Sequence, residues 1–185
     1  MHYIIGLTGR NAAGKGTIAN LLKKHKFIYH SLSDTLREEL SHQNMEESRD
    51  NLISIGNTLR SQGGPGVLAD LMIKNLITPG NHIVDSIRNP SEVHSLRRDY
   101  SVHKFILISI DANPKIRFKR LMKRNRKGDS QSWEQFIEQE KLEETSEDPN
   151  KQQLFSTIKE ADFDIDNSGN LIDLEKKLSL IIDSL

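Results

Sequence analysis

Residues 9–17 of this 185-residue chain read Gly-Arg-Asn-Ala-Ala-Gly-Lys-Gly-Thr, and this stretch decides the fold. The apolar run Tyr-Ile-Ile at residues 3–5 precedes it, and Ile18, Leu21 and Leu22 follow it at helical spacing. The order is therefore strand, glycine-bounded loop and helix. A loop in this position wraps a polyphosphate with its backbone N–H groups, and the helix behind it adds the positive end of its dipole.

The side chains of this loop add to the predicted phosphate site. Lys15 supplies a mobile positive charge for the β- and γ-phosphates. The residue after Lys15 is a glycine and the hydroxyl follows at Thr17, so we expect Thr17 to contact a phosphate oxygen and magnesium to be held largely through water. The candidate nucleotide-binding residues of the loop are Gly9, Asn11, Ala12, Ala13, Gly14, Lys15, Gly16 and Thr17.

Length and composition bound the class of protein. The chain is long enough for one domain with a sizeable core. It carries 26 basic and 26 acidic residues, so its net charge of zero gives no overall attraction to nucleic acid or to an anionic membrane. The absence of cysteine excludes disulfides, thiolate zinc sites and thiol nucleophiles. No apolar run approaches membrane-spanning length and the chain starts directly on a strand, so we expect a cytoplasmic protein.

Strands and helices are predicted to alternate along the chain. This alternation indicates an α/β fold with a parallel sheet of about five strands and helices on both faces. Ligands of such folds bind at the carboxyl ends of the strands. The predicted strands are residues 3–7, 27–30, 82–85, 105–110 and 163–166. The predicted helices are residues 17–25, 34–40, 52–60, 67–76, 90–98, 115–126, 133–144, 152–161 and 171–183, with Ser33 or Asp34 as the cap of the second.

Polar residues follow the second and third predicted strands. Asp34 and Arg37 lie one helical turn apart after the second strand, where the arginine could fork onto an acceptor phosphate or, equally, be a solvated partner of a helix-capping acid. Asp85 ends the buried third strand, and we favour a role in holding magnesium over a capping role. Arg88 is a second candidate for the acceptor's anionic group.

The helix predicted at 115–126 is strongly basic. Arg117, Arg120 and Arg124 share one face, which can neutralise charge on a moving phosphoryl group. The glycine at 128 breaks the helix as the hinge of a lid would. Alternatives are a solvated face, pairing with the acidic segment 138–148, or nucleic-acid binding, which is disfavoured because no aromatic residues are interleaved with the charges. Whether Arg117 or Arg126 enters the site stays open.

The segment Gly63–Gly66, with Asn57 and Arg60 just before it, either shapes an acceptor pocket between two helices or is a plain connector. The seven histidines show no paired metal-ligand spacing. We expect one domain over residues 1–185, with an acceptor-binding helical insertion at about 34–78 and a lid at about 117–145. No feature of the sequence indicates an oligomeric state.

These motifs together resemble the P-loop nucleotide kinases, over nearly the whole chain. The opening at 4–9 (Ile-Ile-Gly-Leu-Thr-Gly) and the ending at 161–169 are similar to dephospho-CoA kinases. The Lys-Gly-Thr at 15–17 and the Asp-x-Leu-Arg at 34–37 are similar to adenylate kinases. The middle of the chain, with Gly-Asn-x-Leu-Arg at 56–60 continuing to the glycine at 66 and Asp-Ser-Ile-Arg-Asn at 85–89, resembles an archaeal adenylate-kinase-related family and the kinase-like domain of some deoxycytidylate deaminases. The zinc signature of the deaminases themselves is missing.

The resemblance implies a three-layer P-loop NTPase fold with a small lid, and ATP with Mg²⁺ as cofactors. It implies that Lys15 and Thr17 bind ATP phosphates and that Asn167 lies beside the adenine. It also implies that Arg37 and Arg88 match acceptor-phosphate arginines. By the same resemblance, Arg120 and Arg124 match lid arginines. The resulting catalytic candidates are Lys15, Asp34, Asp85, Arg120 and Arg124. The substrate-binding candidates are Asp34, Arg37, Arg60 and Arg88, and the metal-site candidates are Thr17 and Asp85.

The expected activity is ATP-dependent phosphoryl transfer to a small-molecule nucleotide. A nucleoside or deoxynucleoside monophosphate is favoured as acceptor because two arginines converge on the acceptor side. The alternatives are a hydroxyl acceptor of the dephospho-CoA type, for which Asp34 is the candidate base, and a nucleotide-binding regulatory module without transfer activity. A kinase of RNA or DNA ends is a third, less favoured alternative, and no membrane partner is expected.

Overall fold

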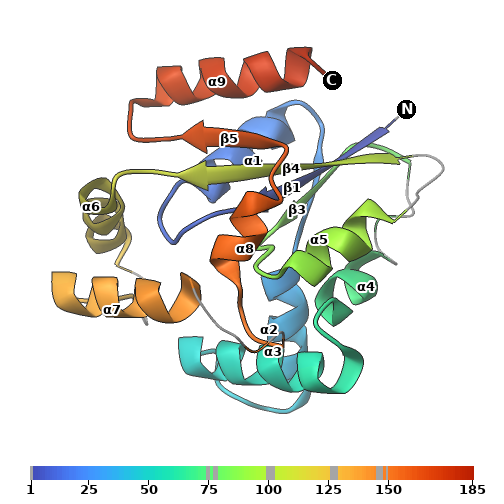
Figure 1. Ribbon diagram of the computed structural model, residues 1–185, viewed down its shortest axis with the longest axis vertical. Coiled ribbons are helices and arrows are strands. Elements are labelled where there is room, and N and C mark those ends of the chain that lie inside the picture. Colours follow the sequence, from blue (N-terminus) through green and yellow to red (C-terminus); the bar gives the residue numbers. More distant parts are fainter. Residues whose placement is uncertain are drawn as a thin grey trace.

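The computed structural model describes residues 2–73, 76, 79–98, 103–125, 129–144, 148 and 150–185. Its centre is a five-stranded parallel sheet in the order β2-β3-β1-β4-β5, with helices on both faces (Figure 1). The strands are β1 (His2–Thr8), β2 (Ile28–Ser31), β3 (His82–Asp85), β4 (His103–Asp111) and β5 (Phe163–Asp166). The α/β fold class predicted from the sequence is confirmed.

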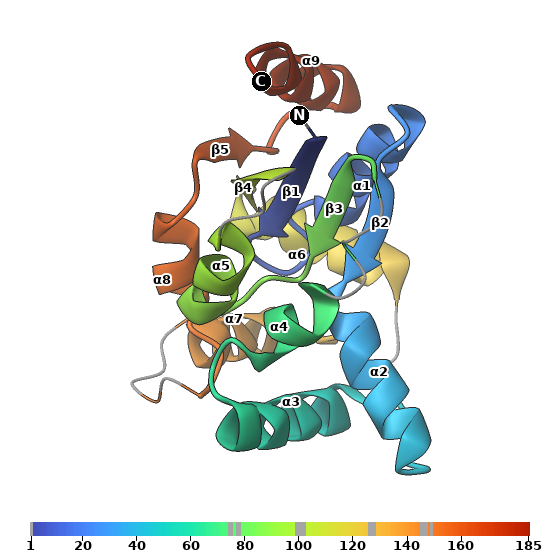
Figure 2. The same ribbon diagram turned by 90° about the vertical axis from the view of Figure 1, so that its right-hand side faces the viewer.

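The fold has three layers, because both faces of this sheet are covered by helices. They are α1 (Lys15–Lys24), α2 (Leu32–His42), α3 (Arg49–Gly63), α4 (Val67–Ile73), α5 (Pro90–Arg97), α6 (Pro114–Arg124), α7 (Trp133–Glu144), α8 (Leu154–Lys159) and α9 (Leu171–Asp183). In Figure 2, β1, β2 and β3 point toward the end of the molecule where α2, α3, α4 and α7 lie. The carboxyl ends of the strands therefore face these helices. No described helix is both long and apolar enough to cross a bilayer.

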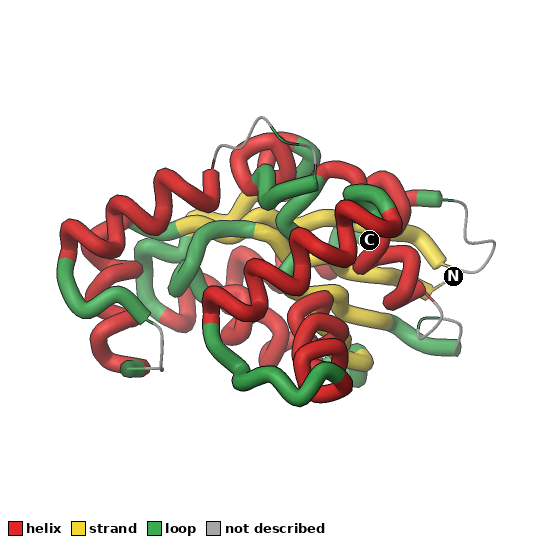
Figure 3. The backbone as a smooth tube through the Cα atoms, turned by 90° about the horizontal axis from the view of Figure 1, so that it is seen from below, coloured by secondary structure: helices red, strands yellow, loops and turns green. Residues whose placement is uncertain are grey.

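The two faces of the sheet carry separate cores because successive side chains of a strand point to opposite faces. Ile5 and Leu7 of β1 pack with α1 and α9, whereas Ile4 packs with α4 and α5. All three side chains have no exposed surface. In the tube view of Figure 3, which looks from below, the helices at the bottom of Figure 1 lie in front of the strands. Burial on both faces explains why the central strands read as almost continuous apolar runs.

The start of α2 differs from the sequence prediction. Ser31 is the N-cap, and its hydroxyl accepts a hydrogen bond of 3.3 Å from the backbone N–H of Ser33, so the prediction of Ser33 or Asp34 as cap is wrong. The physical reason is that β2 passes into α2 without a loop, which places the cap on the last residue of the strand. Gly56 lies inside α3 and does not interrupt it.

Helices α6 and α7 are joined by a buried cation. The Arg117 side chain is 2 % exposed and pairs through both terminal nitrogens with Glu140 of α7, its Nη2 lying 2.9 Å from Oε2. The guanidinium also faces the ring of Phe136, 5.3 Å from the centroid. Of the alternatives open for the basic helix, pairing with the acidic segment therefore holds for Arg117. The candidate residue Arg126 and the predicted hinge at 128 lie outside the described residues.

Replacing Arg117 with methionine should lower the free energy of unfolding by about 3 kcal/mol, because it leaves the largely buried Glu140 carboxylate without its partner. The double variant Arg117→Met/Glu140→Leu should recover much of that loss, since neither charge then remains between α6 and α7. Urea unfolding followed by circular dichroism measures both. An Arg117→Met protein as stable as the wild type would contradict the structural role of this pair.

Candidate active site

The loop at residues 9–17 is shaped by two glycines. Gly9 has φ 130°, and a Cβ there would lie 2.0 Å from the Ile110 carbonyl oxygen. Gly14 has φ 114°, and a Cβ there would lie 2.1 Å from the amide nitrogen of Asn167. Any larger residue at either place would clash and would strain the backbone. The glycines therefore bring the loop against the carboxyl ends of β4 and β5.

In the described part of the chain, the amino terminus of α1, like that of α8, lacks the side-chain cap that five other helices have. Among the described residues no side chain caps it, and its first turn contains no acidic residue. By contrast, the side chains of Ser31, Ser48, Asn89, Asn113 and Asn170 cap α2, α3, α5, α6 and α9. An uncapped helix start with a lysine beside it suits an anion, because the dipole and the backbone N–H groups favour negative charge. The loop therefore fits a phosphate group.

Lys15 lies inside this loop. Its ammonium donates hydrogen bonds to the carbonyl oxygens of Gly9, at 2.6 Å, and Arg10, at 3.0 Å. Burial and, second, the nearby positive charge of Arg88 lower the pKa of Lys15 to about 8, while the charge of Asp85 opposes the shift. The ammonium is thus close enough to Arg88 and Asp85 for their charges to act on it. A phosphate between these groups would favour the protonated lysine.

Asn167, a predicted nucleotide-binding residue, and Arg120, a predicted lid arginine, brace the loop from behind. The Asn167 side-chain amide donates to the Ala13 carbonyl oxygen at 2.8 Å. Arg120 of α6 donates to the carbonyl oxygen of Asn167 at 2.8 Å and to that of Ala13 at 3.3 Å. The structure therefore brings Arg120, Asn167 and the loop together. In this arrangement Arg120 binds backbone carbonyls of the loop and of the turn after β5.

Arg124, one turn further along α6, lies on the open side of the loop. Its guanidinium pairs with both oxygens of Asp129, at 2.8 and 2.6 Å, and donates to the Asn11 side-chain oxygen at 2.9 Å. Arg117 points instead to Glu140, away from this group. Asp129 was not among the predicted site residues, because a carboxylate after a glycine reads as an ordinary loop residue until its arginine partner is placed.

Asp85 ends β3 next to the loop. Its carboxylate accepts hydrogen bonds from the Ser86 backbone N–H at 2.6 Å and from the Tyr29 hydroxyl at 3.1 Å. Burial and, second, the negative charge of Asp85 raise the pKa of Tyr29 to about 12. The Thr17 side chain is exposed. In the part of the chain that is described, no three acidic or histidine side chains gather around one point, so magnesium here would take most of its ligands from water and phosphate.

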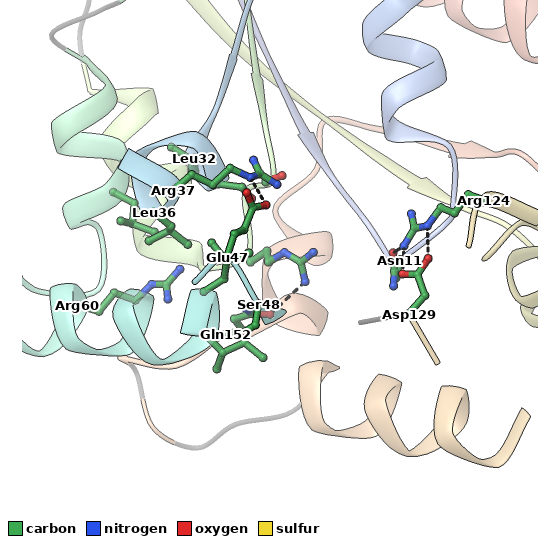
Figure 4. Close-up of a pocket in the computed structure, with 16 residues that line it drawn as sticks. Asn11, Leu32, Leu36, Arg37, Glu47, Ser48, Arg60, Arg124, Asp129 and Gln152 are labelled. Carbon is green, nitrogen blue, oxygen red and sulfur yellow. Dashed lines mark hydrogen bonds and ion pairs between the residues drawn. The ribbon is translucent and has the colours of Figure 1, made fainter. Parts of the chain in front are cut away.

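A pocket of about 260 Å³ opens beside the loop (Figure 4). Its apolar lining comes from α2, α3 and α4 and consists of Leu32, Leu36, Leu52, Ile53 and Leu68. Its charged lining residues are Arg37, Arg60, Arg88, Arg124, Glu47 and Asp129. In Figure 4, Arg37 and Arg60 lie on one side, and Arg124 lies with Asp129 on the other. The pocket therefore offers guanidinium groups around an apolar floor.

Of the predicted acceptor-binding residues after the second and third strands, the two arginines line the pocket and the aspartate does not. Arg37 lines the pocket and pairs with Glu47 at 2.8 Å and with Asp34 at 2.7 Å. Asp34 itself is half-exposed and is not a lining residue. Arg88 lines the pocket and donates to the Gln152 side-chain oxygen at 3.1 Å. Glu47 and Gln152 are distant in sequence from any motif, so the sequence held no signal for them.

Arg60 lines the pocket from α3 and forms a buried ion pair. Its Nη2 lies 2.9 Å from Oε1 of Glu92, and the two side chains are 4 % and 0 % exposed. The other carboxylate oxygen of Glu92 accepts hydrogen bonds from the backbone N–H groups of Arg88, at 2.8 Å, and Asn89, at 3.1 Å. The carboxylate of Glu92 therefore binds both the guanidinium of Arg60 and the backbone N–H of Arg88. Sequence analysis missed Glu92, whose only signal was its place in the first turn of a predicted helix.

Known proteins share this architecture. The crystal structure of TT1252 from Thermus thermophilus matches with a TM-score of 0.64 at 20% identity, covering 100% of this chain and 98% of that one. A shikimate kinase from Bacteroides thetaiotaomicron matches with a TM-score of 0.62 at 13% identity, covering 98% and 97%. At these identities the likeness shows the fold alone, which is a kinase-like P-loop fold. The finer resemblance to adenylate kinases and dephospho-CoA kinases stays a prediction.

Sequence relatives define the family. A family model described as an AAA domain matches residues 5–143. A UPF0200 protein of Pyrococcus horikoshii is 30% identical over 144 residues, which are 76% of this chain and 77% of the relative. A UPF0200 protein of Thermococcus gammatolerans is 27% identical over 186 residues, covering 98% of this chain and 95% of the relative. This chain therefore belongs to the UPF0200 protein family, and its residues 5–143 belong to the AAA-domain family.

Proposed function

We propose that this chain transfers a phosphoryl group from ATP to a nucleoside or deoxynucleoside monophosphate. The uncapped start of α1 and the ammonium of Lys15 support binding of the ATP phosphates at residues 9–17. Asn167 and Arg120, which hold the far side of the loop, are the groups nearest to a purine in this proposal. Thr17 and Asp85 would hold Mg²⁺ largely through water, and the ion would neutralise charge on the β- and γ-phosphates.

The observation that carries the proposal is the position of Arg88. It lines the pocket, and its positive charge is the second cause of the lowered pKa of Lys15. One guanidinium is therefore close both to the predicted γ-phosphate site and to the candidate acceptor pocket. A phosphate-bearing acceptor would meet Arg88 and Arg37 in that pocket, with its remaining atoms on the leucine floor. In this proposal, helices at about 34–78 bind the acceptor and residues at about 117–145 form the lid.

The transfer itself needs alignment more than a base. An oxygen of the acceptor monophosphate is already anionic, so it attacks the γ-phosphorus directly, a new P–O bond forms and ADP leaves with the electrons of the broken bond. Arg88 and Arg37 would position the acceptor. Arg124, which is partly exposed, would turn from the largely buried carboxylate of Asp129 toward the moving phosphoryl group, whose negative charge would replace that carboxylate as its partner. Lid closure would exclude water and suppress ATP hydrolysis.

The hydroxyl-acceptor alternative has less support. It requires a base in the pocket, and the predicted base Asp34 is half-exposed, pairs with Arg37 and does not line the pocket. The regulatory-module alternative shares the whole nucleotide site. It differs from the proposal only in lacking acceptor-dependent transfer, so a transfer assay separates the two.

A screen for ADP release should identify the acceptor. The full chain is incubated with Mg²⁺ and ATP plus one ribonucleotide or deoxyribonucleotide monophosphate, or dephospho-CoA, at a time. We expect ADP release that depends on a monophosphate and that falls by about 10²-fold or more in Lys15→Ala, because the phosphate charge loses its ammonium partner. Lys176→Ala, which removes an exposed lysine of α9, is the matched control and should behave as the wild type.

Three results of this screen would decide against the proposal. Release with dephospho-CoA alone would favour the hydroxyl acceptor. ATP binding without any acceptor-dependent release would favour the regulatory module. Undiminished release in Lys15→Ala would show that the transfer site lies elsewhere.

Nucleotide affinity should fall as the pH rises. The pKa of Lys15 in the free protein is about 8, and bound phosphate favours the ammonium, so binding above pH 8 takes up a proton. The association constant for a non-hydrolysable ATP analogue should be flat below about pH 7.5 and then fall, by up to about tenfold per pH unit above 8. Calorimetry in buffers of different ionisation enthalpy measures both the affinity and the proton uptake. In Lys15→Met the affinity should be weak at every pH, and a wild-type profile without slope up to pH 9.5 would refute this role of the lysine.

A further inference from the structure

Glu92 is a buried carboxylate that the proposed transfer does not use. It is 0 % exposed and stands in the first turn of α5, behind the pocket wall. Its Oε1 accepts from Arg60 of α3 at 2.9 Å, and its Oε2 accepts from the backbone N–H groups of Arg88 at 2.8 Å and Asn89 at 3.1 Å. One carboxylate therefore joins α3, the loop after β3 and α5.

Helix capping explains only part of this arrangement. Glu92 and Asn89 form a capping box, and α9 has a second capping box made by Asn170 and Asp173. Asp173 is exposed, whereas Glu92 is fully buried and carries an arginine from another helix. Capping of α5 does not require that arginine. The additional ion pair instead fixes a guanidinium that lines the pocket.

Arg88 is held from further directions. Its carbonyl oxygen accepts from the Gln153 backbone N–H at 2.9 Å, and its Nη1 donates to the Gln152 side-chain oxygen at 3.1 Å. The Asn89 side chain donates to the Lys151 carbonyl oxygen at 3.0 Å. Glu92 thus holds the backbone of Arg88 on one side while residues 151–153 hold it on the other. A small displacement of Glu92 would move the Arg88 guanidinium as well as that of Arg60.

We propose that Glu92 is a positioning residue for the acceptor, because it fixes Arg60 and Arg88 in the pocket wall so that both face the acceptor together. This inference rests on the proposed function. Glu92 does not touch the acceptor itself; it acts through the two arginines.

The chemistry of Arg60 adds a constraint on the acceptor. Its Nε–H is buried and has no hydrogen-bond partner among the described residues. A guanidinium can only donate hydrogen bonds. The part of the acceptor that reaches Arg60 must therefore present a hydrogen-bond acceptor, such as a carbonyl oxygen, a ring nitrogen or an anionic oxygen.

The test is equilibrium binding of both ligands to Glu92→Gln. The full chain is saturated with Mg²⁺ and a non-hydrolysable ATP analogue. The adenosine, guanosine, cytidine and uridine monophosphates and their deoxy counterparts are then titrated in by calorimetry. Glutamine has one accepting oxygen, so it cannot accept all three hydrogen bonds and its NH₂ faces a donor. We expect monophosphate affinity to fall about tenfold to a hundredfold, with affinity for the ATP analogue changed by less than about twofold.

Two further variants separate positioning from folding. Arg60→Lys keeps a positive charge opposite Glu92 but removes the planar guanidinium with its several hydrogen-bond donors. It should therefore also weaken monophosphate binding selectively. If a urea titration shows that Glu92→Gln is not folded, the binding data for Arg60→Lys decide the proposal. Asp173→Asn removes the carboxylate of the second capping box, far from the pocket, and should bind both ligands as the wild type does.

The possible outcomes are distinct. Selective loss of monophosphate binding in both pocket variants supports the positioning role. Equal loss of monophosphate and ATP-analogue binding, or unchanged binding of both, overturns it. A wild-type protein that binds a monophosphate but transfers no phosphate refutes the proposed transfer, while the binding data still decide the role of Glu92. A wild type that binds none of the eight monophosphates overturns both.

Discussion

The start of α1 is the feature on which the rest of the site depends. A helix normally satisfies its first backbone N–H groups with a side-chain cap, and five other helices of this chain do so. The first turn of α1 has neither a capping side chain among the described residues nor an acid. Gly9 and Gly14 let the loop before it lie against the carboxyl ends of β4 and β5. The fold thereby presents an anion-binding helix terminus at the edge of the sheet where ligands of parallel sheets bind.

The arginines around this site fall into two groups by burial. Arg60 and Arg117 are nearly inaccessible and pair with Glu92 and Glu140. Breaking such a pair leaves a buried charge, so these two arginines keep their positions when a ligand binds. Arg37 and Arg124 are more exposed. The carboxylates that pair with Arg37 are exposed, whereas Asp129, which pairs with Arg124, is 6 % exposed and lines the pocket. A phosphate can compete for exposed pairs, because surface ion pairs are individually weak. The site therefore combines fixed cations with exchangeable ones.

Prediction from sequence worked best where the local pattern is strong. The predicted bounds of β3, β5, α7 and α9 match the structure to the residue. It failed where distant contacts decide a boundary. Helix α8 begins at Leu154 rather than at residue 152, because residues 151–153 bond to Arg88 and Asn89 instead of continuing the helix. The segment between the helices predicted at 34–40 and 52–60 is also shorter in the structure, since α2 runs to His42 and α3 begins at Arg49.

The sequence by itself determined the fold class and the identity of the phosphate loop. Hydrophobic periodicity and the glycine-lysine spacing are local properties, and each is encoded within about ten neighbouring residues. Only the tertiary structure decided which charges meet: that Arg117 pairs with Glu140, that Asp34 lies off the pocket, and that Glu92 links Arg60 to Arg88. The reason is that Coulomb interactions depend on distance in space, and residues 32 positions apart carry no sequence signal of their contact.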